Sequence, residues 1–317
     1  MNLLHSVRAV TGASGTGQVD WEAVAAAAKA ATEPGSVDLS PGEREGYAAD
    51  ARDARDRLRT VAGVDFDLPP AVEVQHRHHW IDANVRTIRR VVRPLEERGP
   101  ATVPGVARVA NTGSLSVALA FLARHVLGQY DPRLLADGSE DPGLYFVDPN
   151  IRATATELGV EYPRFRRWIA FHEVAHAAEF GAAPWLGDHI ERRIERALAA
   201  FADGRFDRGA VRDLDTAMTA VEGYAELLMD RAFDAEYADL RAKVDARRRG
   251  GDVLTRLLKR ALGLGLKRRQ YERGAAFFRA VADARGVEAA ARAWERPENL
   301  PTDAELDAPE RWLARVS

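Results

Sequence analysis

The chain has 317 residues, of which 46% are hydrophobic and 29% are charged, a balance typical of a globular protein with ample material for a core. Its formal net charge is −3, whereas nucleic-acid-binding proteins usually have a basic excess, so we expect no nucleic-acid partner. There is no cysteine, which excludes disulfides and thiolate metal sites and leaves His, Asp and Glu as the ligands of any bound metal.

The first residues of the chain lack the features of a targeting sequence. The segment "MNLLHSVRAVTGASGTG" has no sustained apolar core of the kind that a signal peptide needs, and no apolar stretch is expected to reach membrane-spanning length. We therefore expect a cytoplasmic location and no membrane partner.

Helices dominate the predicted elements, because alanine and arginine are abundant and runs of β-branched or aromatic residues are few. In chain order, helices are predicted over residues 20–31, 41 to about 60, 78–98, 114–130, 163 to about 181, 188–202, 213–243 and 254–284. Asp20 is placed to cap the first helix, and Ser40 begins a capping box for the second. Residues 144–150, "LYFVDPN", predict one short strand. We expect a mainly α fold, α+β at most, with a few short strands.

The main chemical signal is "WIAFHEVAHAAEF", residues 168–180, which contains an HExxH motif made by His172, Glu173 and His176. On a helix, positions i and i+4 lie on one face, so both imidazoles can reach one Zn²⁺ at about 2.0–2.1 Å. Glu173 lies about 100° around the helix from His172, beside the metal, where it can take a proton from a zinc-bound water. Chance alone would produce this motif in about one chain in a hundred of this length. The apolar flanks favour a metal, because a buried histidine pair without a partner is costly.

A third protein ligand is needed, because catalytic zinc sites combine three protein ligands with an open position. The metzincin pattern requires Gly at position 179 and His at position 182, but the chain has Glu179 and Ala182. Glu179 lies about two helical turns, roughly 10 Å, from His172, which is a poor position for closing the site. A carboxylate from a later helix is the other solution.

Two later helices carry glutamate pairs at i, i+4. Glu191 and Glu195 have arginines beside them, which is typical of a solvated, ion-paired face. Glu222 and Glu226 are the only charged residues of residues 216–229, and carboxylates in an apolar helix need compensation. We assign Glu222 as the third ligand and expect Glu226 to hydrogen-bond a ligating histidine or to line the substrate site. The alternative is a buried pair that shares a proton or binds arginine.

Tyr271, in "KRRQYERGAAF", is a further catalytic candidate. Zinc peptidases often need a donor for the oxyanion that forms on the substrate, and a tyrosine hydroxyl can serve. A tyrosine packed at a helix contact is the alternative. Gly223 is expected to let another helix approach Glu222 closely.

Two other motifs predict no chemistry. The three histidines of residues 76–79 have no helical i, i+4 pairing, and we expect them at the surface or beside a site. The glycines of residues 10–17 have the spacing G-x-x-G-x-G and follow no buried strand, so they do not match a dinucleotide-binding fingerprint.

Four segments together resemble a known family. They are "WIAFHEVAHAAEFGAAPWLGDHI", "AVEGYAELLMDRAFD", "KRRQYERGAAFFRAV" and "AWERPENLPTDAEL", and they are similar to the zincin-like family of coenzyme F-420 biosynthesis-associated proteins. The resemblance covers most of residues 65–317. It implies a mostly helical, metallopeptidase-like fold. The family name records an association with a pathway and no reaction.

The resemblance also carries residue roles. The HExxH roles fall on His172, Glu173 and His176, and the family's Glu-Gly-x-Ala-Glu motif falls on Glu222 to Glu226. Family members often have histidine at the middle of that second motif, where this chain has Tyr224, so any role of that histidine is in doubt here.

Residues 98–106, "RGPATVPGV", are the best linker candidate, and no internal repeat is present. We predict an N-terminal helical region at residues 1–105 that packs on the core, and a zincin-like metal-binding domain at residues 106–317. The two regions are expected to form one compact unit.

These features predict a zinc-dependent hydrolase, a peptidase or amidase that acts on a peptide or a small amide, with Zn²⁺ as its cofactor. Glu173 would deprotonate the attacking water and pass the proton to the leaving amine. The alternative is a non-catalytic zincin-fold protein with a structural zinc, acting as a partner in the metabolism of the deazaflavin coenzyme F-420. A structural zinc has four protein ligands, whereas a catalytic zinc keeps one position open.

Overall fold

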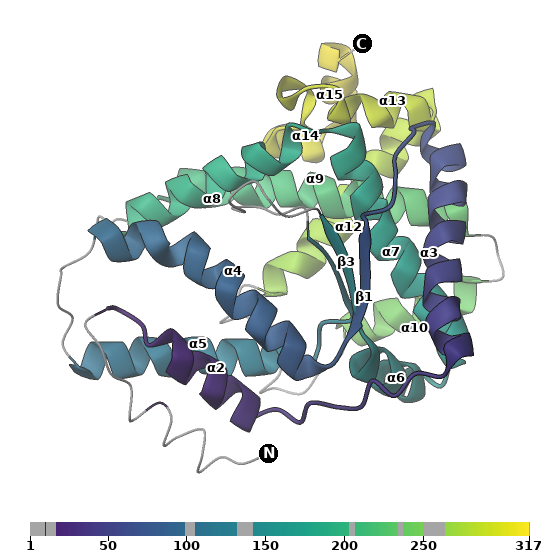
Figure 1. Ribbon diagram of the computed structural model, residues 1–317. Helices are drawn as coiled ribbons and strands as arrows, with labels where there is room; N and C mark the ends of the chain where they lie inside the picture. Colours follow the sequence, from purple (N-terminus) through teal and green to yellow (C-terminus); the bar gives the residue numbers. More distant parts are fainter. Residues whose placement is uncertain are drawn as a thin grey trace.

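The computed structural model describes residue 10 and residues 17–98, 105–131, 142–202, 207–233, 237–249 and 264–316. Within these ranges, it does not describe the side chains of residues 94, 95, 97, 98, 198, 200–202, 248, 249 and 264–271. Most of the described chain is helical, and three short strands form one sheet (Figure 1). The predicted mainly α fold is confirmed.

Along the chain, helices lie before, between and after the three strands. They are α2 (Trp21–Ala30), α3 (Pro41–Ala62), α4 (Arg77–Arg98), α5 (Gly105–Ala123), α6 (Asp148–Leu158), α7 (Tyr162–Ala182), α8 (Leu186–Ala202), α9 (Arg208–Ala232), α10 (Ala238–Arg249), α12 (Leu264–Arg285), α13 (Val287–Ala291), α14 (Asp303–Leu306) and α15 (Pro309–Val316). Short 3-10 turns, η2 (Arg292–Trp294) and η3 (Pro297–Asn299), follow α13. The predicted caps are present: Asp20 accepts from the Ala23 N–H, and Ser40 forms a capping box with Glu43.

The sheet has the strand order β1 (Ala71–Gln75), β3 (Gly143–Val147), β2 (Gly128–Asp131). β1 runs parallel to β3, and β2 runs antiparallel to it. β2 is therefore an edge strand of the described sheet.

The backbone groups of β2 alternate between the sheet and its open edge. The register sets Gly128 opposite Phe146 and Tyr130 opposite Leu144. The Val147 N–H donates to the Leu127 carbonyl at 2.9 Å, one position before that register begins. Because ladder bonds fall on alternate residues of an antiparallel pair, Gly128 and Tyr130 direct their N–H and C=O groups away from β3.

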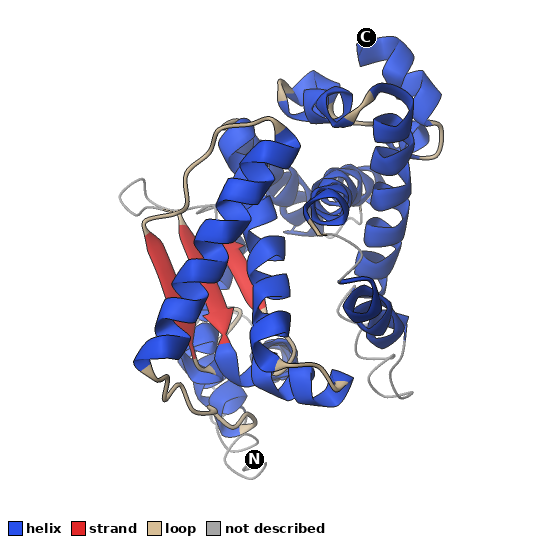
Figure 2. Ribbon diagram, turned by 90° about the vertical axis from the view of Figure 1, so that its right-hand side faces the viewer, coloured by secondary structure: helices blue, strands red, loops and turns tan. Residues whose placement is uncertain are grey.

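Helices cover both faces of the sheet (Figures 1 and 2). Leu144 and Phe146 point into the larger apolar core, which includes α3, α7, α9 and α12. Val147 points the other way, into a smaller core with residues of α2, α4 and α5. This alternation along β3 is the period of two that a strand buried on both faces requires.

Two predicted helices were wrong in extent, and two strands were not predicted. The helix predicted over 114–130 starts earlier and ends at Ala123, and residues 128–131 form β2 instead. The helix predicted over 213–243 is two helices, α9 and α10. β1 was not predicted. Both missed strands are short, so their own residues do not predict a strand, and each forms by pairing with β3.

Elements on either side of residue 105 share both cores and the sheet, since β1 pairs with β3 and α3 packs on α7. The division at residue 105 stays a prediction, and residues 99–104 of the linker lie outside the described residues.

α5 alone among the described helices is long and apolar enough, by length and composition, to cross a membrane. The expectation that no stretch reaches this length is wrong by that criterion. A core helix of a water-soluble domain passes the same test, and Leu119, Ala120 and Ala123 of α5 are buried in the smaller core.

Candidate metal centre

α7 carries the HExxH motif. The helix has Pro163 in its first turn, and it is buried on nearly all sides, with Trp168, Phe171 and Val174 in the larger core. Between residues 171 and 180, only His172, His176 and Phe180 are not fully buried. They lie at i, i+4 and i+8, so the histidines occupy the one face of this segment that solvent can reach.

α9 brings the third candidate ligand to this face. Asp207 caps the helix by accepting from the N–H groups of Gly209 and Ala210. α9 packs against both α7 and α12. At its crossing with α12, a Cβ added to Gly223 would meet the carbonyl carbon of Gly274 at 2.3 Å. The predicted close approach of another helix beside Glu222 is therefore confirmed.

His172, His176 and Glu222 converge. One ligand atom from each lies within 4.8 Å of the others. Glu222 Oε2 lies 3.9 Å from His172 Nε2 and 3.8 Å from His176 Nε2. Ligand atoms around a tetrahedral zinc are about 3.4 Å apart, given metal–ligand distances near 2.1 Å. Two imidazoles and one carboxylate fit zinc by chemistry, and small side-chain movements bring their distances into range.

Comparison with known proteins identifies the family. A family model described as zincin-like metallopeptidase matches residues 19–205 and 196–313. The chain belongs to the zincin-like metallopeptidase family. A crystal structure from Chloroflexus aurantiacus, of a protein named as a presumed hydrolase with a novel fold, is similar with a TM-score of 0.72 and 30% sequence identity, over 99% of this chain and 98% of that one. A search of curated proteins gave no match.

Glu179 orients one of the zincin histidines. Its Oε2 lies 2.9 Å from His176 Nδ1, which leaves Nε2 directed at the Glu222 carboxylate. Burial lowers the pKa of His176, but the Glu179 and Glu222 carboxylates outweigh burial and hold this pKa above its usual value. Burial raises the pKa of Glu179. Glu179 was excluded as a ligand because of its position, and its contact with His176 was not predicted. The i, i+3 spacing of the two residues is a sufficient signal for that contact.

Glu173 contacts the edge strand β2. Its Oε2 accepts a hydrogen bond from the Tyr130 N–H at 3.0 Å. Its side chain also lies directly against the backbone of Gly128. Neither contact was predicted, because β2 itself was not predicted and Gly128 was placed in a helix.

Glu226 forms an ion pair with an arginine, and its expected place beside a ligating histidine or the substrate stays a prediction. Its Oε2 accepts from Arg241 of α10 at 2.6 Å. This is the alternative in which an arginine satisfies the buried carboxylate. The carboxylate within hydrogen-bond distance of His176 is that of Glu179.

Tyr224 is buried between Phe278 and Trp294, with ring centroids 5.3 and 5.4 Å away. Burial raises its pKa, so the phenol stays neutral. The structure therefore places this position in the core beside the site.

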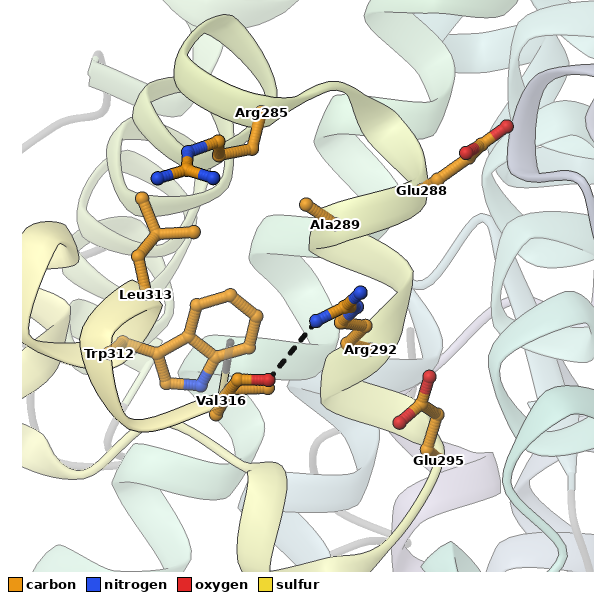
Figure 3. Close-up of a pocket in the computed structure, with 8 residues that line it drawn as sticks. All are labelled: Arg285, Glu288, Ala289, Arg292, Glu295, Trp312, Leu313 and Val316. Carbon is orange, nitrogen blue, oxygen red and sulfur yellow. Dashed lines mark hydrogen bonds between the residues drawn. The ribbon is translucent and has the colours of Figure 1, made fainter.

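The other sequence candidates do not join the cluster. The backbone of Tyr271 lies in α12, one turn before Gly274, but its side chain lies outside the described residues. Among described side chains, the grouped metal-ligand candidates include neither the α8 glutamates nor the histidines of residues 76–79. A hollow of about 550 Å³ near the C-terminus contains no cluster residue (Figure 3). There, Arg292 donates to the Val316 carbonyl at 3.2 Å beside the buried Trp312.

Proposed function

We propose that this protein is a zinc-dependent hydrolase that cleaves a peptide or amide bond, with Glu173 as its general base. The observation that carries the proposal is the convergence of His172, His176 and Glu222 on the accessible face of α7, with Glu173 beside them. Membership of the zincin-like metallopeptidase family and the similarity to the Chloroflexus protein support a hydrolase.

His172, His176 and Glu222 would hold the zinc ion, and Glu179 would keep His176 in the tautomer that presents Nε2. When bound, zinc supplies a Lewis acid that polarises the scissile carbonyl and acidifies the attacking water. Glu173 receives the proton of that water and delivers it to the leaving nitrogen. Tyr271 is our candidate donor to the oxyanion, because its helix crosses α9 at Gly223, next to Glu222.

The open edge of β2 favours an extended peptide as the substrate. The edge-directed groups of β2 lie beside Glu173, and since the Tyr130 N–H donates to Glu173, a peptide would pair with the Gly128 N–H and C=O and with the Tyr130 C=O. An extended chain can add to such an edge by main-chain hydrogen bonds, which would hold it beside the metal. A compact small amide could use fewer of these groups.

The number of ligands favours catalysis over a structural zinc. The described side chains offer three donor groups at the cluster, and a structural zinc has four. A closed site would support the alternative, a non-catalytic partner protein in deazaflavin coenzyme metabolism. The buried Glu173 has no evident purpose in a closed site.

The test combines zinc content with hydrolysis. Zinc is measured by mass spectrometry in the purified protein and in the variants Glu173→Gln, His172→Ala and the exposed control His79→Ala. Hydrolysis is measured with a peptide library by mass spectrometry. We expect the Glu173 variant to keep zinc but lose activity by at least about 100-fold, because general acid–base catalysis contributes about 10²–10⁴-fold.

The His172 variant should lose both zinc and activity, and the control should keep both. Zinc that is unaffected by His172→Ala would overturn the metal assignment. Unchanged hydrolysis in Glu173→Gln would overturn the role of the base.

A further inference from the structure

We infer that Gly128 and the Tyr130 N–H of β2 form a cradle that positions Glu173 for its role as the base. The inference rests on the proposed hydrolase, and it adds Gly128 as a positioning residue that nothing in the HExxH motif requires. The cradle consists of the Gly128 Cα and the Tyr130 N–H, which contact different parts of one carboxylate side chain.

Gly128 supplies space. A Cβ added at this position would lie 2.6 Å from Cγ, 2.7 Å from Oε1 and 2.8 Å from Cδ of Glu173. All three distances are too short for real carbon contacts. Only glycine therefore allows the Glu173 side chain to lie against this strand.

Tyr130 supplies the hydrogen bond. Its N–H points to the open edge of the sheet, because Tyr130 is not a ladder-bonded position opposite Leu144. The N–H donates to Glu173 Oε2 at 3.0 Å. A charge-assisted bond from a backbone group held in a sheet fixes the carboxylate better than a mobile side chain would.

Gly128 and the Tyr130 N–H together hold the Glu173 side chain in one rotamer. A glutamate has three rotatable side-chain bonds, and a base must be held within about 0.5 Å of its productive position. Gly128 limits where Cγ and Cδ can go, and Tyr130 anchors one oxygen. The remaining oxygen, Oε1, lies against Gly128, where an added Cβ would be 2.7 Å from it.

An alanine at 128 should therefore move the base and spare the fold. The three nearest obstructing atoms belong to the Glu173 side chain. A flexible side chain can swing aside at little cost, so Gly128→Ala is expected to fold and to keep the zinc ligands. The displaced Glu173 would then be a poor base, because a 1 Å misplacement can cost about 100-fold in rate.

The test uses acetohydroxamic acid as a probe of the zinc-loaded protein, measured by calorimetry. A hydroxamic acid chelates zinc and gives its proton to an adjacent carboxylate, so its affinity reports where Glu173 lies, even before a substrate is known. The variants are Gly128→Ala, Glu173→Gln and the double variant, with Gly42→Ala as a control, because an added Cβ there meets nothing within 4 Å.

We expect Gly128→Ala and Glu173→Gln each to weaken the probe by about 10- to 100-fold, the value of one hydrogen bond to a charged group. The double variant should be no weaker than Glu173→Gln alone, and zinc content should match the wild type in all. Hydrolysis, where a substrate has been found, should fall with probe affinity. Wild-type affinity in Gly128→Ala, a further loss in the double variant, or loss of zinc would each overturn the cradle.

The backbone donor is tested separately, so that the inference remains falsifiable should Gly128→Ala fail to fold. Tyr130→Pro and Tyr130→Ala both remove the phenol, which packs on Phe180 at 5.4 Å, but only proline removes the N–H. Proline is tolerated at edge positions that make no ladder bond. We expect at least tenfold weaker probe binding in the proline variant, and equal binding would overturn the inference. If probe binding follows the predicted pattern but no hydrolysis is found, the proposed function is overturned and the cradle is not.

Discussion

Glu179, Glu222 and Glu226 are carboxylates with at most 4% of their surface exposed. Burying a charge is costly unless it is paired. Glu179 meets His176 at 2.9 Å, and Glu226 meets Arg241 at 2.6 Å. Glu222 faces two imidazoles at nearly 4 Å, a distance at which a bound cation would compensate its charge better than either ring. At the scale of single residues, the distance to the nearest charged partner therefore distinguishes the candidate ligand Glu222 from Glu179 and Glu226.

The role of Glu179 leads to a prediction for metal affinity. Glu179→Gln removes the charge that orients and polarises His176, so zinc should bind about 10- to 100-fold more weakly. A competition titration with a chromophoric chelator measures this change. The control is Glu195→Gln, an exposed glutamate of α8. Equal zinc affinity in the Glu179 variant and the wild type would show that the His176 contact does not support the metal.

At the scale of elements, the crossing of α9 and α12 lies directly beside Glu222 and fixes where this part of α9 sits. Gly223 and Gly274 meet backbone to backbone, and a Cβ on Gly274 would lie 2.1 Å from the Thr219 carbonyl oxygen. Backbone cannot swing aside as the Glu173 side chain can. The same substitution, glycine to alanine, is therefore expected to have opposite consequences at positions 223 and 128.

Gly223→Ala should lower the free energy of unfolding by about 1–3 kcal/mol, because the two helices must separate to accept the methyl group. This loss is expected although alanine is favoured over glycine in a helix by about 1 kcal/mol. Urea denaturation followed by circular dichroism measures the change. Gly42→Ala in α3, where the added Cβ meets nothing, is the control and should be neutral or stabilising. A Gly223 variant as stable as this control would contradict the crossing.

At the scale of the whole molecule, the metal site joins parts of the chain that are far apart. α7 supplies His172 and His176, α9 supplies Glu222, and the Tyr130 N–H of β2 donates to Glu173. A zinc ion bound there stabilises only the folded chain, because the unfolded chain does not hold these groups together. Zinc removal should therefore weaken the whole fold.

The stabilisation by zinc is expected to depend on pH as well as on the zinc concentration. Free zinc at 100 times its dissociation constant should add about 2.7 kcal/mol to the free energy of unfolding. The carboxylates around His176 raise its pKa, so below that pKa zinc must displace a proton from a ligand. The gain in melting temperature on adding zinc to the chelator-treated protein should be larger at pH 8 than at pH 6. A gain that is equal at both pH values would contradict proton competition at His176.

Much of the fold was predictable, because helix signals are local. The caps at Asp20 and Ser40 and the helical pattern around the HExxH motif involve residues only a few positions apart. The strands β1, with five residues, and β2, with four, were missed because such short segments show little hydrophobic alternation. Their hydrogen bonds go to β3, in another part of the chain. The missed β2 also concealed the contacts of Glu173.

The sequence by itself determined the chemistry of the site: His172 and His176 one turn apart, Glu173 beside them, and in α9 a glutamate whose apolar surroundings demand a partner. The tertiary structure decided which of the two α9 glutamates faces the histidines, and that Arg241 takes the other. It also decided that Gly128 and Tyr130 contact Glu173. The reason is physical: helical periodicity is set by neighbouring residues, whereas partners across the core are set by how helices and strands pack.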